Sequence, residues 1–145
     1  MTDLESVRIR IADPSDADRI LAGYDTWKYS GGVGPADTVW IAESTNELIG
    51  AVRIVSEHGT LVLRGMRIAD QWRRHGIGSQ MLHVIAAWLG KRECYCIPYL
   101  HLVRFYGSAG FAEVAPACAP SFLAERMAEY RGRGLNVIIM RRCPL

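Results

Sequence analysis

The 145-residue sequence lacks several features that mark special classes of protein. No apolar run approaches the roughly 18–20 residues that a membrane-spanning helix needs. The first ten residues, MTDLESVRIR, contain acidic side chains and no apolar segment of the secretory type, so we expect a cytoplasmic protein that does not bind membranes. Repeats, linkers and low-complexity stretches are also missing. We therefore expect residues 1–145 to form a single domain, of a size at which about 68–70% of the unfolded surface becomes buried.

The sequence also has little excess charge of either sign. Lysine and arginine together number 17 and aspartate and glutamate 15, which gives a formal net charge of +2 at pH 7. An excess this small does not by itself indicate a nucleic-acid partner. Half of the residues are apolar and 22% are charged, a composition typical of globular rather than disordered chains.

The four cysteines lack the spacing of a metal site or a disulfide framework. Cys94 and Cys96 are separated by one residue, whereas zinc-binding pairs are usually separated by about two to four. In a strand both side chains would point to the same face, where reduced cysteine behaves as a small apolar residue. We therefore expect reduced thiols in the core and no metal.

Hydrophobic periodicity predicts a mixed α/β order of elements. We expect strands at 7–12, 38–43, 47–55, 60–69 and 93–98, after Gly110, and at 135–140, and helices from 13–16 onward, from Gly76, at about 100–108 and from Pro120. The strand, helix and strand between 60 and 98 form a crossover unit, which favours a parallel pair. Gly65 inside a predicted strand indicates a bulge or a close approach by another group.

The segment 71–80, QWRRHGIGSQ, has the features of an anion-binding turn. It follows a predicted strand and leads into an amphipathic helix, whose first backbone N–H groups have no partner inside the helix. Gly76 and Gly78 allow phosphate oxygens to approach the main chain, and Arg73, Arg74 and His75 add positive charge. A dinucleotide fingerprint would need a third glycine at Met81, and a Walker loop would need Gly-Lys-Ser/Thr, so neither nucleotide motif fits.

Two motifs resemble those of the GNAT superfamily of acyl-CoA-dependent N-acyltransferases. Arg73-Arg74-His75-Gly76-Ile77-Gly78 is similar to its Arg/Gln-x-x-Gly-x-Gly/Ala loop, and the segment 105–111 to its Phe-Tyr-x-x-x-Gly-Phe segment. The order of strands and helices agrees from Val7 to Met140. The resemblance implies a GNAT-like α/β (α+β) fold, in which a mixed, mostly antiparallel sheet with a central splayed parallel strand pair is flanked by helices.

The resemblance also implies roles for individual residues. Arg73 and the backbone N–H groups of Arg74, His75, Gly76, Ile77, Gly78 and Ser79 would bind the pyrophosphate of coenzyme A. Main-chain groups near Met66 and Ile68 would hold the pantetheine arm, and Tyr106 would protonate the departing thiolate. The family often has asparagine where this chain has Tyr99, and alanine where it has Leu102. These two differences bear on the pantetheine contacts of that segment.

The function that follows from the resemblance is an acetyl-CoA-dependent N-acetyltransferase. Its acceptor would be a primary amine of a small molecule or peptide, and a homodimer is what the family suggests. The sequence does not select a general base among Glu43, Glu57, His58, His101, Glu113 and water. A non-catalytic acyl-CoA-binding or regulatory module stays open as an alternative. An RNA-binding domain is a weaker one, because stacking aromatics interleaved with the basic residues are missing.

Overall fold

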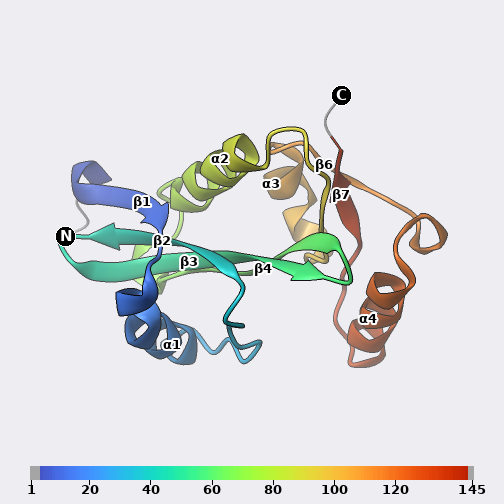
Figure 1. Cartoon of the computed structure of the whole chain (residues 1–145). Coiled ribbons are helices and arrows are strands. Elements are labelled where there is room, and N and C mark those ends of the chain that lie inside the picture. Colours follow the sequence, from blue (N-terminus) through green and yellow to red (C-terminus); the bar gives the residue numbers. More distant parts are fainter. Residues whose placement is uncertain (1–3, 144–145) are drawn as a thin grey trace.

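The structure is a computed structural model that describes residues 4–143, and its centre is one seven-stranded sheet (Figure 1). The strands lie in the order β1-β2-β3-β4-β5-β7-β6. Their bounds are β1 Val7–Ile11, β2 Thr38–Ser44, β3 Glu47–Glu57, β4 Thr60–Ile68, β5 Cys94–Cys96, β6 Phe111–Glu113 and β7 Met140–Arg142. The β4–β5 pair is parallel and the other neighbouring strands are antiparallel. The predicted fold class, with its central parallel pair, is confirmed.

In the described part of the chain, four α-helices cover the two faces of the sheet, and their bounds are α1 Ala17–Thr26, α2 Ile77–Leu89, α3 Val103–Gly107 and α4 Ser121–Gly132. In Figure 1, α1 and α4 lie below the sheet and α2 and α3 above it. The buried side chains divide in the same way. Ile85 of α2 and Tyr106 of α3 belong to one core cluster, whereas Ile20 of α1 and Leu123 of α4 belong to two others. The sheet therefore separates the α1/α4 side of the molecule from the α2/α3 side.

Local sequence signals explain where several elements begin and end. Asp13 caps a 3-10 turn that precedes α1, and the Asp16 carboxylate accepts a hydrogen bond from the Asp13 backbone N–H, which completes a capping box. The β2–β3 hairpin turns at Thr45 and Asn46, both with positive φ, as a two-residue hairpin connection requires. Gly90 ends α2 at the predicted position.

Two predicted elements differ from the structure. The predicted helix at 100–108 begins as a 3-10 turn, Leu100–Leu102, and only then becomes α3. The prediction of a strand at 135–140 is wrong, because the strand is β7 and begins at Met140. Val137, Ile138 and Ile139 before it are buried, but the segment has a single bridge, from Val137 to Tyr99. Pro98 on the neighbouring segment has no N–H to donate, and the chain turns at Leu100, so a regular ladder does not form there.

Strand β4 carries two irregularities that shape the centre of the sheet. It pairs with β5 at one position, Val62 opposite Tyr95, so the two strands diverge beyond it. On its other edge, Gly65 and Met66 stand opposite Val52 alone, because Arg64 pairs with Arg53 and Arg67 with Ala51. Gly65 has φ +69°, which glycine adopts without strain. The predicted bulge is confirmed.

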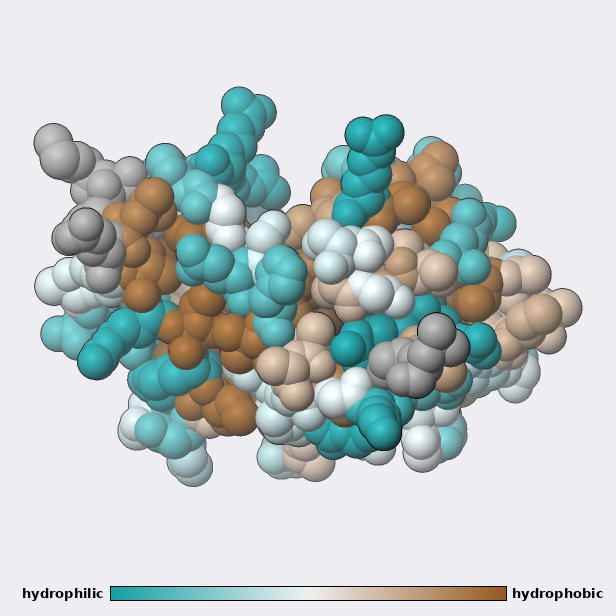
Figure 2. Space-filling model, turned by 90° about the horizontal axis from the view of Figure 1, so that it is seen from above, coloured by the Kyte–Doolittle hydropathy of each residue, from teal (hydrophilic) through white to brown (hydrophobic). Residues whose placement is uncertain are grey.

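The surface seen from above α2 and α3 mixes hydrophilic and hydrophobic residues (Figure 2). Apolar areas on this face are separated by polar ones and do not form one continuous patch. Within residues 4–143, no helix has both the length and the apolar character that crossing a bilayer would require.

Candidate active site

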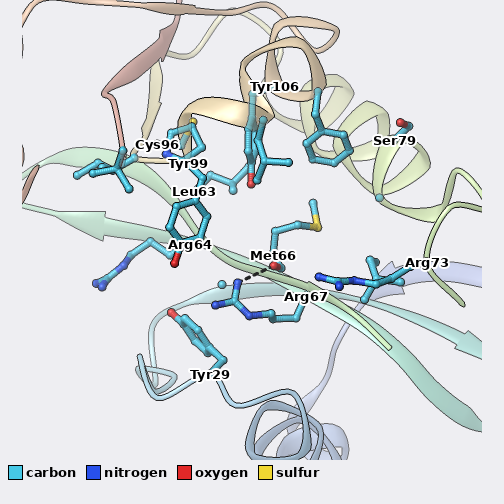
Figure 3. Close-up of a pocket in the computed structure, with 18 of the residues that line it drawn as sticks. Tyr29, Leu63, Arg64, Met66, Arg67, Arg73, Ser79, Cys96, Tyr99 and Tyr106 are labelled. Carbon is cyan, nitrogen blue, oxygen red and sulfur yellow. Dashed lines mark hydrogen bonds between the residues drawn. The ribbon is translucent and has the colours of Figure 1, made fainter. Parts of the chain in front are cut away.

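A cavity of about 640 Å³ lies where β4 and β5 diverge (Figure 3). Its walls come from β4, from the turn and first residues of α2, from the segment after β5, and from α3 and α4. It therefore joins parts of the chain that are far apart in the sequence. One end lies at the predicted anion-binding turn, and the other lies against α4 and Tyr29.

The turn before α2 presents free backbone donors to this cavity. Arg74 and Gly76 both have positive φ, at 68° and 79°. Gly76 is the N-cap of α2, and no side chain caps the helix there. The first helical bond is from Gln80 N–H to the Gly76 carbonyl, at 3.0 Å. The N–H groups of Ile77, Gly78 and Ser79 have no hydrogen-bond partner among residues 4–143, so the helix start offers unpaired donors and a positive dipole end.

The two glycines of the turn serve different purposes. A Cβ at Gly76 would meet no atom within 4 Å, so its requirement for glycine is the left-handed backbone alone. A Cβ at Gly78 would lie 3.0 Å from Cζ of Phe105. Gly78 therefore lets α2 pack closely against α3, the helix that carries Tyr106.

The structure brings nearly all the predicted site residues to one cavity. Those that line it are Met66, Ile68, Arg73, Arg74, Gly76, Ile77, Gly78, Ser79 and Tyr106. His75 is not among the lining residues; it is exposed, with its ring 6.5 Å from that of Trp72. The prediction that the backbone N–H of His75 binds phosphate stays a prediction.

The edge of β4 that faces β5 supplies main-chain groups along the cavity. Ala69 N–H donates to Ile49 of β3 at 2.7 Å, so by strand alternation the N–H of Ile68 points to the other edge, into the space between β4 and β5. Because β5 pairs with β4 only at Val62, this edge is not occupied by a neighbouring strand. It offers a place for an extended ligand to pair with backbone.

Tyr106 lies at the centre of the cavity wall. Its side chain comes from α3, is 6% exposed, and extends into the cavity above β4 (Figure 3). Its hydroxyl has no hydrogen-bond partner within the part of the chain that the structure describes. Burial raises the pKa of Tyr106 well above its ordinary value, and the nearby Cys96 thiol acts in the same direction. The phenol is therefore protonated throughout the neutral and mildly alkaline range.

The residues considered as a general base lie elsewhere. Glu43 accepts hydrogen bonds from Arg10 and Arg19, which lower its pKa, and it is not a lining residue. Burial acts to raise the pKa of Glu57, but the hydrogen bonds from Arg126, at 2.8 and 3.0 Å, together with the positive charges of Arg126, Arg64 and Arg53, lower the pKa overall. Among residues 4–143, no aspartate, glutamate or histidine lines the cavity.

Several lining residues were not singled out as site residues by the sequence. Arg64 and Arg67 line the cavity beside Gly65, where the sequence indicated only a bulge or the close approach of another group. Tyr29, which follows α1, and Arg126 of α4 also line it. The sequence offers Tyr29 and the segment 116–133, which contains Arg126, as walls of an acceptor pocket, but it does not separate that role from simple packing.

Comparison with known proteins identifies the family. A model described as "Acetyltransferase (GNAT) domain" matches residues 35–113, which is more than half of the chain. The chain belongs to this family. The match includes β4, the turn before α2, and Tyr106 of α3. A search of curated protein sequences gives no significant match.

Solved structures share the fold at low sequence identity. N-acetylglutamate synthase from Neisseria gonorrhoeae, in a complex with coenzyme A and N-acetyl-glutamate, matches with a TM-score of 0.65 and 19% identity. That match covers 94% of this chain but 34% of the synthase, so the chain spans about a third of that protein's length. A GNAT acetyltransferase from Staphylococcus aureus Mu50 matches at 0.64, with 13% identity and coverage of 94% and 98%. Arabidopsis thaliana Naa50, in a complex with the bisubstrate analogue CoA-Ac-MVNAL, matches at 0.66, with 15% identity and coverage of 96% and 99%.

Proposed function

We propose that this acetyltransferase-family protein transfers an acetyl group from acetyl-CoA to a primary amine of a small molecule or peptide, by direct attack. The observation that carries the proposal is the order of groups along the cavity. Unpaired N–H groups at the start of α2 come first, then the free edge of β4, then the buried Tyr106 hydroxyl. The complexes of the synthase with coenzyme A and of Naa50 with a coenzyme A analogue support this choice of cosubstrate.

The residues present fit the parts of acetyl-CoA. The N–H groups of Ile77, Gly78 and Ser79 would bind the pyrophosphate, which suits a helix N-terminus with a positive dipole end. Arg73 and Arg74 would add charge to the same site. The Ile68 N–H that points toward β5 and the main chain at Met66 would hold the extended pantetheine arm. The arm would lie beside β4, in the space where β5 no longer pairs with it.

The chemistry needed from the chain is modest. When bound, acetyl-CoA supplies an activated thioester. The amine nitrogen forms a bond to the carbonyl carbon, the C–S bond breaks, and the amine releases its proton to solvent. A backbone N–H near the bulge at Met66 would stabilise the negative charge that develops on the carbonyl oxygen. Tyr106 would donate its proton to the leaving thiolate and regain one from solvent, so that the products are an amide and a free thiol.

Proton removal from the amine has no side-chain base in the cavity, which bears on the acceptor. A lysine-like amine of pKa about 10.4 is almost fully protonated at neutral pH, whereas an α-amino group of a peptide, with pKa about 7.7–8.0, is partly neutral. The acceptor amine therefore has to lose its proton to water before it attacks, whichever class of amine it is.

Thermal shift with acetyl-CoA followed by a thiol-release assay tests the proposal. A ligand at a hundred times its dissociation constant stabilises the folded state by about 2.7 kcal/mol, which gives a clear rise in Tm. Release of free thiol that depends on an added amine then shows transfer. No Tm change at millimolar acetyl-CoA would contradict the proposal, and a Tm change without thiol release from a broad amine panel would favour the binding module.

A further inference from the structure

The cavity walls carry an unusual balance of charge. Five arginines line the cavity, and among the described residues no carboxylate does. Arg73 and Arg74 belong to the turn before α2, where the phosphates of the proposed cosubstrate would lie. The other three, Arg64, Arg67 and Arg126, lie on the opposite side, so the phosphates do not account for them.

The bulge in β4 places two of these arginines on the same face of the sheet. Residues three apart on a regular strand point to opposite faces. Here Arg64 pairs with Arg53 and Arg67 with Ala51, which are two residues apart on β3, so Arg64 and Arg67 share a face. This is the α1/α4 face, opposite the side of Tyr106. Figure 3 shows Arg67 and Tyr29 on one side of β4, and Met66 and Tyr106 on the other.

A second hollow, of about 460 Å³, opens from the cavity on this face. Its walls are the loop after α1 and one side of α4, and it shares Tyr29, Arg64, Arg67, Arg126, Tyr130 and Leu135 with the main cavity. Lys28 and Arg133 also line it, and Glu129 is its one acidic lining residue within residues 4–143. The hollow is therefore a basic entrance to the point where β4 diverges from β5.

Arg67 differs from its neighbours because it lacks a counter-ion. Arg126 and Arg64 both pair with Glu57, at 2.8 and 3.4 Å. Arg67 forms no ion pair with any carboxylate in the described chain. Its guanidinium donates to the Met66 carbonyl at 2.9 Å and lies 4.9 Å from the centre of the Tyr29 ring. A half-buried cation that faces a cavity without a partner has donors available for an anion.

Tyr29, the platform beneath Arg67, is itself held in place. Its hydroxyl accepts a hydrogen bond at 2.7 Å from Arg53, which is 3% exposed and also donates to Asp37 at 2.8 Å. The Tyr29 ring packs 4.7 Å from that of Tyr24, whose hydroxyl donates to the Gly65 carbonyl at 2.8 Å. These contacts fix the position of Arg67 relative to the bulge, as a preorganised binding group requires.

We propose that the acceptor is a small amine that carries a carboxylate, that is, a free amino acid, and that Arg67 binds this carboxylate. The proposal rests on the proposed acetyl transfer and specifies its acceptor. The planar guanidinium pairs with a carboxylate through two parallel hydrogen bonds. This pairing would orient the amine toward the space between β4 and β5, and the second hollow would take the remainder of the amino acid.

Matched pairs of acceptors test this proposal. Each pair contains an amino acid and its α-carboxamide, for example glutamine with glutamine α-amide and glycine with glycinamide, and each is assayed by thiol release. For at least one acid, we expect kcat/KM to be about tenfold or more higher than for its amide. A tenfold ratio corresponds to the free energy lost with one charge-assisted hydrogen bond. Phosphoethanolamine and a short peptide with a free amino terminus complete the panel. A preference for either over every amino acid, or equal transfer to acid and amide, overturns the proposal.

The variant Arg67→Gln links the preference to its residue. It should raise KM for the preferred acid about tenfold or more, and should leave KM for acetyl-CoA and the Tm rise with acetyl-CoA unchanged. Arg67→Lys, which keeps the charge but loses the planar fork, should recover part of the acid preference. Arg8→Gln is the matched control, because Arg8 is exposed on β1 and lines neither hollow.

Different results would contradict the proposed acetyl transfer and the proposed carboxylate site. If acetyl-CoA gives no Tm rise in the wild type, the proposed function fails first. If acetyl-CoA binds but no amino acid is acetylated, or Arg67→Gln leaves the acid preference intact, the carboxylate proposal alone is overturned.

Discussion

At the scale of single residues, Tyr106 is the group on which the proposed chemistry depends. It is buried, extends into the cavity, and has a raised pKa, because burial disfavours the phenolate. The phenol therefore holds a proton that it can donate, although the raised pKa makes it a weaker acid than a thiol of ordinary pKa about 8.5. Its neighbour Phe105 instead contacts Gly78 and fixes the position of the helix.

Tyr106→Phe tests this assignment. We expect kcat to fall about a hundredfold, at the low end of the range for loss of a general acid, because the leaving thiolate is no longer protonated. The affinity for acetyl-CoA, measured by calorimetric titration, should change little. Tyr95→Phe is the control, since the Tyr95 hydroxyl lies outside the cavity and receives a hydrogen bond from Arg141. Equal loss in both variants would mean that Tyr106 serves only for packing.

At the scale of elements, the turn before α2 and its close contact with α3 form the proposed phosphate site. The turn needs Gly76 for its left-handed backbone and Gly78 for the space that Phe105 occupies. Gly76 therefore affects the backbone N–H groups that would bind phosphate, and Gly78 affects the position of α3, which carries Tyr106.

Substitution of each glycine by alanine separates these effects. Gly76→Ala should lower the free energy of unfolding by about 1–2 kcal/mol, the cost of a left-handed conformation with a Cβ, and should weaken acetyl-CoA binding. Gly78→Ala should reduce kcat more than affinity, because Phe105 must move and Tyr106 is adjacent to it. Both are measured by urea unfolding and steady-state kinetics. Gly132→Ala, at the end of α4 with open space around it, should change neither. Unchanged binding in Gly76→Ala would argue against a phosphate site at this turn.

A second element-scale feature is the ion-pair network that attaches α1 to the edge of the sheet. Asp16 is 3% exposed and accepts hydrogen bonds from Arg10 at 2.9 and 3.0 Å and from Arg19 at 2.8 Å. The hydrogen bonds from Arg10 contribute most to a strongly lowered pKa of Asp16. Because this pKa is lower in the folded than in the unfolded chain, the stabilisation is present above pH about 4 and is lost as pH falls further.

Asp16→Asn should lower the free energy of unfolding by about 1–2 kcal/mol at pH 7, since hydrogen bonds to a charged group are lost. The difference in the free energy of unfolding between the variant and the wild type should shrink as the pH falls below about 4, because the unfolded wild-type chain then binds a proton at Asp16 that the folded chain does not, which favours unfolding. Urea unfolding at several pH values between 7 and 3 measures both. Asp18→Asn, an exposed change on the same helix, should have little effect. A difference that does not depend on pH would show that the carboxylate charge is not the cause.

At the scale of the whole molecule, one sheet connects all the described elements, and three clusters of buried side chains pack on its two faces. The proposed cosubstrate site lies on the α2/α3 side and the proposed acceptor site on the α1/α4 side. They meet at the divergence of β4 and β5. We propose that residues 1–145 form one domain that unfolds as a unit.

Differential scanning calorimetry tests that proposal. We expect one transition, with equal calorimetric and van't Hoff enthalpies of about 100 kcal/mol, from about 0.7 kcal/mol per residue. Acetyl-CoA should shift the whole transition upward without splitting it. Two separable transitions would show that the two sides fold independently.

The sequence by itself determined the features that depend on local chemistry. The turn at 73–78, the helix after it and the bulge at Gly65 follow from backbone conformations and periodicities that a few adjacent residues impose. Tyr106 came instead from the resemblance of the segment 105–111 to a family motif, which local chemistry alone does not single out.

Only the tertiary structure decided what depends on contacts between distant segments. Arg126 reaches the cavity because α4 packs against the end of the sheet. Among residues 4–143, Arg64 and Arg126 share Glu57 as a counter-ion, whereas Arg67 has none. The residues 135–139 read as a strand on hydrophobicity alone, but a strand also needs a continuing ladder of partner groups. Pro98 has no N–H to donate and the chain turns at Leu100, so the pairing is limited to the bridge between Tyr99 and Val137. Charge balance and strand pairing are properties of neighbours in space, which the order of residues does not specify.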